Sequence, residues 1–115
     1  MKSERRRHRS PFTSIALGRW LDAVAARNGL SGLVLGDACG LLVAHGAMDV
    51  DRAEAVAAIA PIDSVVDVPG AMRVLRFEHE GAPLVLAGLG QEPRLDALVD
   101  AQIGVARILS ERAAA

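Results

Sequence analysis

The stretch Gly29-Leu-Ser-Gly-Leu-Val-Leu-Gly-Asp-Ala-Cys-Gly-Leu-Leu-Val-Ala44 contains two apolar runs separated by a short polar break. The runs cover 30–36 and 41–46, and Gly40 in the break can adopt the positive φ that a tight hairpin turn needs. Neither run alternates cleanly between apolar and polar residues, which is typical of strands buried on both faces. The stretch therefore predicts an antiparallel hairpin in a sheet that is covered on both sides.

Helical patterns lie on either side of this hairpin. Before it, apolar residues recur every three or four positions across 14–28. After it, 53–60 is rich in helix-forming residues and stops before Pro61. A longer apolar periodicity runs from 95 to about 110, and Pro93 suits the first turn of that helix. The pattern predicts a first, a short middle and a long final helix.

Three further strands are predicted between the middle and final helices. Residues 62–68 place apolar side chains on one face and aspartates on the other, which is typical of a half-exposed edge strand. Residues 72–79 are rich in strand-forming types, and 83–88 carry no charge, which predicts a central position. Pro69-Gly70 and Glu80-Gly81 supply the turns between them.

Composition predicts one water-soluble domain in the cytoplasm. The chain has 115 residues, of which 51% are hydrophobic and 23% charged, close to the average for globular domains. Its apolar runs are too short to cross a bilayer, so no stable membrane insertion is expected. The lone Cys39 is consistent with a reducing compartment. We expect a basic flexible tail at 1–12, a single domain at 13–112 and a disordered terminus at 113–115.

The basic tail offers an electrostatic contact. Its arginines are Arg5, Arg6, Arg7 and Arg9. Residues 1–10 carry a net charge of +4, which leaves −5 on the rest of the chain. Such a cluster could touch nucleic acid, an anionic membrane surface or an acidic partner, although a solvated tail is the preferred interpretation. No aromatic residue is interleaved to stack on bases, so nucleic acid is not predicted as a partner.

Patterns that indicate chemistry are weak. The only lysine is Lys2, which excludes a phosphate-binding P-loop. Gly88-Leu89-Gly90 superficially resembles a dinucleotide-binding turn, but no parallel unit is predicted around it. Cys39 and His45 are the only candidates for a nucleophile and a base, and turn and strand-end roles explain both residues better. We predict no catalytic, cofactor-binding or metal-binding residues, hence no cofactor and no enzyme.

The order of these elements resembles the roadblock/dynein light chain domain family over residues 14–112. The first hairpin carries most of the resemblance, since Asp37, Gly40, Leu41 and Ala44 match its family form. The resemblance implies an α+β fold with a five-stranded antiparallel sheet in the order 2-1-5-4-3. It places the first and last helices on one face and the middle helix on the other.

Family resemblance also implies a homodimer, formed by pairing third strands and packing middle helices together. The implied interface residues are Ala53, Val56, Ala57, Ala60, Ile62, Ser64, Val65, Val66, Asp67 and Val68. Bacterial members are partners or activators of small Ras-like GTPases in cell polarity and gliding motility. The middle helix is shorter here than is usual in the family, which leaves open whether this chain contacts a GTPase or another roadblock protein.

The leading hypothesis is a non-enzymatic homodimeric adaptor or co-regulator in a small-GTPase module. It would bind through the two-helix face of its sheet or through its paired middle helices. One alternative is a small-molecule sensor that holds a ligand between sheet and helix, although 3% aromatic residues specify no pocket. Another is a hydrolase that uses Cys39 and His45.

Overall fold

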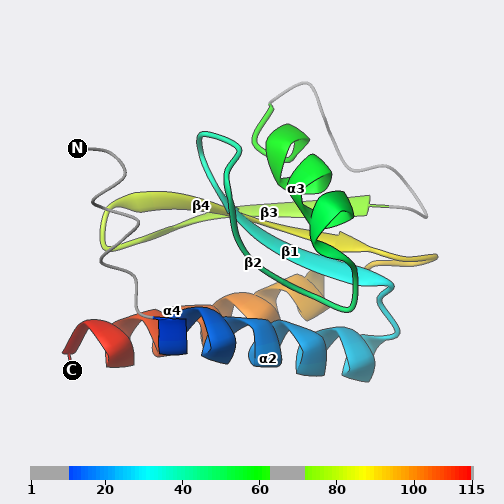
Figure 1. Ribbon diagram of the computed structural model, residues 1–115. Helices are drawn as coiled ribbons and strands as arrows, with labels where there is room; N and C mark the ends of the chain where they lie inside the picture. The colour runs from blue at the N-terminus through cyan, green and yellow to red at the C-terminus, as the bar shows by residue number, and fades with distance from the viewer. Residues whose placement is uncertain (1–10, 63–71, 115) are drawn as a thin grey trace.

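The computed structural model describes residues 11–62 and 72–114, and within them the chain is an α+β protein (Figure 1). The helices are α2 (Pro11–Asn28), α3 (Val50–Ile59) and α4 (Leu95–Ala114). The strands are β1 (Gly32–Asp37), β2 (Leu42–Gly46), β3 (Met72–His79) and β4 (Ala82–Leu89). Helix α2 thus begins inside the segment assigned to the basic tail, and α4 extends two residues beyond the predicted end of the domain.

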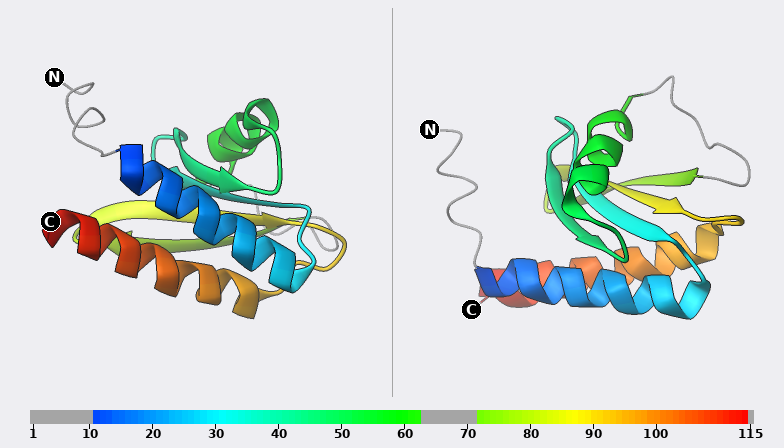
Figure 2. Two further views of the ribbon diagram at one scale, coloured as in Figure 1. Left: turned by 60° about the horizontal axis from the view of Figure 1, so that its bottom comes forward. Right: turned by 45° about the vertical axis from the view of Figure 1, so that its right-hand side comes forward.

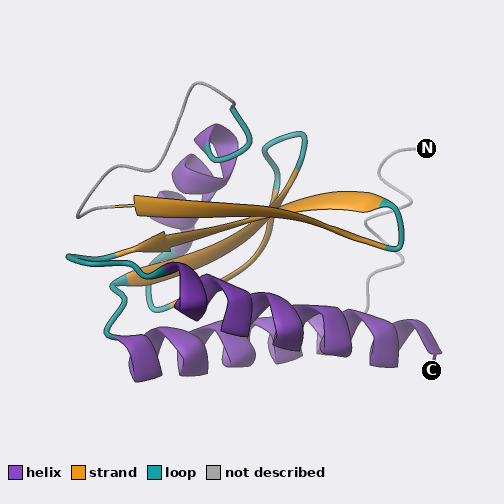
Figure 3. Cartoon of the chain, turned by 180° about the vertical axis from the view of Figure 1, so that it is seen from behind, coloured by secondary structure: helices purple, strands orange, loops and turns teal. Residues whose placement is uncertain are grey.

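The strands form one antiparallel sheet in the order β2-β1-β4-β3. Strand β4 carries no charged residue and pairs with both β1 and β3, so it is central, as its composition predicts. Helices α2 and α4 run antiparallel beneath one face of the sheet, and α3 lies on the other (Figure 2, Figure 3). We call these the two-helix face and the α3 face.

Both hairpins close through the turns that the sequence predicts. Between β1 and β2, Gly40 has φ of 86°, and the Asp37 carboxylate accepts hydrogen bonds from the backbone N–H groups of Cys39 and Leu41 at 2.9 and 3.0 Å. Between β3 and β4, Glu80 and Gly81 have φ of 52° and 82°. Two successive positive φ values match the right-handed twist of the flanking strands, which fixes the register of this hairpin.

The predicted five-stranded sheet, in the order 2-1-5-4-3, is wrong: the described residues form a four-stranded sheet in the order β2-β1-β4-β3. Most of the strand expected at 62–68 lies outside the described residues, and Ile62 is not in a strand. The Ile62 N–H donates to the Ile59 carbonyl (3.0 Å), and its own carbonyl accepts from the Arg76 guanidinium (3.3 Å). These bonds use both the N–H and the carbonyl group of Ile62, and neither bond is made to the backbone of a neighbouring strand. Ile62 therefore ends the turn that follows α3. Alternation over seven residues is weak evidence for a strand, because a strand also needs a partner.

The two-helix face buries the larger core. Its cluster includes Leu17 and Leu21 from α2, Leu33 from β1 and Leu98 from α4, all 0% exposed. Trp20 bridges the two helices, since its indole N–H donates to the Ala101 carbonyl at 2.9 Å. The close packing of these helices depends on the absence of a side chain at Gly104, where a Cβ would overlap the Trp20 ring.

The α3 face buries a smaller core of alanine and valine side chains. Asp49 caps α3, with its carboxylate accepting from the Arg52 backbone N–H at 2.9 Å. Gly36 lets the helix approach β1 closely, because a Cβ there would lie 3.4 Å from the Ala57 methyl group. The Arg76 guanidinium of β3 donates to the Ala60 carbonyl at 3.2 Å and so satisfies a carbonyl at the C-terminus of α3.

None of the described helices is long and apolar enough to cross a membrane. The lengths of α2 and α4 are 18 and 20 residues, but each is amphipathic and buries only one side against the sheet. Their buried apolar residues serve the core of this domain, whereas Leu95, Val99 and Ile103 of α4 are 46%, 40% and 62% exposed.

Candidate functional site

The predicted interface residues of α3 face inward in the single subunit. Their exposed fractions are 0% for Ala53, 7% for Val56, 1% for Ala57 and 2% for Ala60. All four belong to the buried cluster between α3 and the sheet. Ile62, by contrast, is 46% exposed. A second copy that packs on α3 would therefore meet the residues on its outer side, with these four supporting the helix from beneath.

The outer side of α3 presents small and acidic residues. Asp51, Glu54, Ala55 and Ala58 are exposed there, and Ile59 is 43% exposed at the C-terminal end of the helix. Alanines on a helix surface let another backbone come close, and the acidic groups would meet basic or polar groups of a partner. This surface could receive a helix.

Two predicted sets of residues lie outside the part of the chain that the structure describes. They are the remaining interface residues Ser64, Val65, Val66, Asp67 and Val68, and the tail arginines Arg5, Arg6, Arg7 and Arg9. Their proposed contacts stay predictions.

The candidate nucleophile and base lie far apart along the first hairpin. Cys39 is exposed in the turn before β2, and His45 is near the opposite end of that strand. His45 is three strand steps, or roughly 10 Å, beyond Leu42, and Cys39 lies on the far side of Leu42 in the turn. Nucleophilic catalysis needs the two groups within hydrogen-bond reach, so this pair does not form a catalytic dyad in the subunit.

The glycines that superficially resemble a dinucleotide-binding turn follow an antiparallel strand. Strand β4 ends at Leu89 and pairs antiparallel with both neighbours. A dinucleotide turn depends on a parallel strand-helix-strand unit, and the geometry here is different. Across residues 11–62 and 72–114, no three His, Cys, Asp or Glu side chains group to hold a metal ion.

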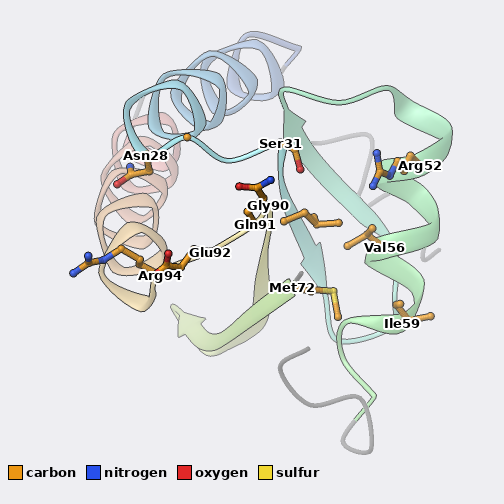
Figure 4. A pocket seen from close by; sticks show the side chains of 12 residues that line it. Asn28, Ser31, Arg52, Val56, Ile59, Met72, Gly90, Gln91, Glu92 and Arg94 are labelled. Carbon is orange, nitrogen blue, oxygen red and sulfur yellow. The ribbon is translucent and has the colours of Figure 1, made fainter. Parts of the chain in front are cut away.

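An open cleft of about 910 Å³ lies between α3 and the ends of three sheet segments (Figure 4). Its walls come from the α2–β1 loop, the first residue of β3, the end of β4 with the following loop, and one side of α3. Val56, Met72 and Leu89 form an apolar floor, and Ser31 and Gln91 stand at the polar rim. Four segments distant in sequence thus create one amphipathic surface.

Two arginines lie beside this cleft, and their surroundings differ. Arg52 extends from α3 toward the cleft (Figure 4), and its guanidinium makes no hydrogen bond or ion pair within the described residues. Arg94 points away from the cleft and contacts the Asp96 carboxylate at 3.2 Å. Arg52 also lies in the first turn of α3, where the helix dipole disfavours a cation. The cleft therefore has one uncompensated positive charge, at its α3 wall.

Sequence reasoning did not find this cleft. Its residues share no motif or spacing, because the fold alone brings 28–31, 52–59, Met72 and 89–92 together. One local signal was present: Arg52 follows the capping residue Asp49 by three positions, where acidic residues are the usual choice. A cation in that position indicates a role other than helix stability.

Comparisons with known proteins identify the fold. No family model and no curated protein matches the sequence. Among solved structures, the chain is similar to Myxococcus xanthus MglB, with a TM-score of 0.59 over 90% of this chain and 93% of that one. The two sequences are 10% identical, so the similarity shows a shared fold, of the roadblock type.

Proposed function

We propose that this chain is a non-enzymatic homodimeric adaptor or co-regulator in the cytoplasm. It binds a small Ras-like GTPase, or another roadblock protein of the same module, in bacterial cell polarity or motility. The observation that carries the proposal is the roadblock-type fold, supported by the similarity to MglB and by the family resemblance of the first hairpin. Family members with this resemblance work as partners or activators of such GTPases.

The contact between copies is proposed to use the outer side of α3 together with residues 62–68. Ala55 and Ala58 are exposed and small, so a second α3 can pack closely against them. Ile59 and Ile62 are 43% and 46% exposed and would add apolar area at one end of this contact. A single subunit leaves this area in water, and a twofold contact would remove it.

Sedimentation velocity with matched variants tests the homodimer. Ala55→Arg puts a long cation on the outer side of α3, and Ala26→Arg puts the same side chain on the exposed side of α2. Each new arginine has an aspartate four residues earlier, Asp51 or Asp22, so both helices gain similar support. We expect a dimer for the parent chain and for Ala26→Arg, and a monomer for Ala55→Arg. A monomeric parent at all micromolar concentrations would contradict the proposal.

Partner capture tests the GTPase role separately. Small Ras-like GTPases of the source organism are loaded with GDP or with a non-hydrolysable GTP analogue and passed over the immobilised chain. We expect one of them, or a second roadblock protein, to be retained, with a GTPase retained preferentially in one nucleotide state. Hydrolysis measured with and without the chain distinguishes activation from recruitment. Failure to retain any GTPase or roadblock protein would overturn the proposed role.

A further inference from the structure

Within the described residues, the cleft beside α3 combines an apolar floor with one cation, Arg52, that makes no ion pair. Val56 and Met72 contribute to the buried core and are each 7% exposed, whereas Leu89 is half-buried and faces the open space. The floor is therefore firm, because the interior of the subunit holds its side chains in place. It offers a fixed surface for aliphatic groups.

The charged side chains at the two ends of the cleft have opposite signs. Arg52 reaches in from α3 and has no carboxylate partner among the residues that the structure describes, and Glu92 lies on the opposite side, in the loop that precedes α4. A carboxylate is attracted at the Arg52 end and repelled at the Glu92 end. Ser31 and Gln91 add hydrogen-bonding groups along the rim between them. An occupant should therefore place its negative group against α3.

The open shape favours a polypeptide over a small molecule. Sites for small molecules surround about 70–90% of the ligand surface, which an open cleft does not do. An extended segment can instead lie across the floor, place alternate side chains on it, and bond the rim through its backbone. The length of the cleft, from the α2–β1 loop to the C-terminal half of α3, suits this mode.

We infer that the cleft binds an extended segment of a partner protein in which an acidic side chain is flanked by aliphatic ones. The carboxylate pairs with Arg52, and the aliphatic side chains cover Leu89 and Met72. This inference rests on the proposed adaptor role and specifies the chemistry of the partner. It also assigns a function to Arg52, whose positive charge in the first turn does not stabilise α3.

Selection from a phage-displayed library of random short peptides on the immobilised full chain tests the inference. We expect the enriched peptides to share an aspartate or glutamate between aliphatic residues. A labelled synthetic copy of an enriched peptide should shift the backbone NMR signals of Ser31, Arg52 and Gln91. Enrichment without an acidic residue, shifts confined to other parts of the surface, or no enrichment would each overturn it.

Two arginine variants provide the matched measurement. Arg52→Ala should weaken peptide binding about tenfold in fluorescence anisotropy, as expected for the loss of a charge-assisted contact. Arg94→Ala should bind like the parent, because that guanidinium points away and contacts Asp96. Both side chains are exposed, and equal melting temperatures would show that the variants fold. Equal affinities of Arg52→Ala and the parent chain would overturn the inference.

The outcome can be separated from that of the proposed function. Arg52 lies on the cleft side of α3, whereas the proposed contact between copies uses Ala55 and Ala58. Loss of peptide binding in Arg52→Ala with an intact dimer would support the cleft alone. Peptide binding by a monomeric parent chain that captures neither a GTPase nor a roadblock protein would support the cleft and overturn the adaptor proposal.

Discussion

The two faces of the sheet differ in what their helices bury. Among the described residues, the cluster on the two-helix face has eight leucines, whereas the cluster on the α3 face has none and consists of alanine, valine and one methionine. Two helices of 18 and 20 residues cover the first face, and one helix of 10 residues covers the second. Large side chains thus fill the core on one face of the sheet, and small side chains fill it on the other.

The difference indicates that the two-helix face mainly stabilises the fold and that the α3 face mainly offers surface for binding. Burial of a leucine side chain contributes about 1.5–3 kcal/mol, so the two-helix face supplies most of the hydrophobic stabilisation. The α3 face contributes less and retains the open cleft and the exposed outer side of its helix. Variants can test whether the two faces differ in this way.

The largest effect is expected where β2 touches α2. A Cβ at Gly46 would lie 2.6 Å from the Leu21 carbonyl carbon and would also overlap the backbone of Asp22. Because backbone cannot move aside as a side chain can, Gly46→Ala should cost about 3 kcal/mol or more in urea unfolding.

Gly18→Ala is the matched control for that contact. A Cβ at Gly18, on the α2 side, would lie 3.6 Å from the His45 carbonyl, which is ordinary contact. The change should stabilise the protein by up to about 1 kcal/mol, because alanine favours the helix interior. A loss below about 0.5 kcal/mol for Gly46→Ala would show that α2 does not pack tightly on β2.

A valine-to-alanine pair compares the faces directly. Val24 on α2 is 0% exposed and Val56 on α3 is 7% exposed. We expect Val24→Ala to cost about 2–3 kcal/mol and Val56→Ala about 1–2 kcal/mol, because the structure beside the cleft can relax around the missing methyl groups. Both sites are helical, so helix propensity cancels in the comparison. Equal costs in urea unfolding would contradict the difference between the faces.

A smaller effect is expected at Arg76, which ties β3 to the end of α3. Arg76→Ala removes hydrogen bonds to the carbonyls of Ala60 and Ile62 and should cost about 1 kcal/mol. It should also accelerate amide exchange near the C-terminus of α3. Arg73→Ala, three residues earlier in β3 and therefore on the other face of the strand, is the control. A larger loss of stability in Arg73→Ala than in Arg76→Ala would contradict the role assigned to Arg76.

The smallest effect is expected at the outer surface of the two-helix face. The Arg27 guanidinium contacts the Asp100 carboxylate at 2.6 Å and lies 5.1 Å from the centre of the Trp20 ring. Both charged side chains are about half exposed, so water screens the pair. A double-mutant cycle with Arg27→Ala and Asp100→Ala should give a coupling below about 1 kcal/mol that decreases with added salt. A larger, salt-independent coupling would contradict this.

Local chemistry made most of the fold predictable. Gly40, Asp37 and the Glu80-Gly81 pair specify turns through their own backbone preferences, so both hairpins follow from the sequence. The absence of charge in 83–88 placed that strand correctly at the centre of the sheet. These signals need no information from distant residues.

Features that depend on distant contacts were missed. The five-stranded sheet was wrong because alternation does not show which partners a backbone will find; Ile62, the first residue of the additional predicted strand, bonds to Ile59 and Arg76 instead. The sequence did not predict the cleft, because its walls come from four separate segments. Sequence alone also could not show that the α3 residues predicted for the dimer contact are buried between the helix and the sheet of one subunit.

Amide hydrogen exchange at several protein concentrations tests most directly whether the α3 face is where this protein meets others. A contact between copies should slow exchange in residues 50–60 as concentration rises, because association stabilises the contacting segment. The two-helix face should show no such change. Exchange that is independent of concentration, or protection that grows around Leu95, Val99 and Ile103 on the exposed side of α4, would contradict this assignment.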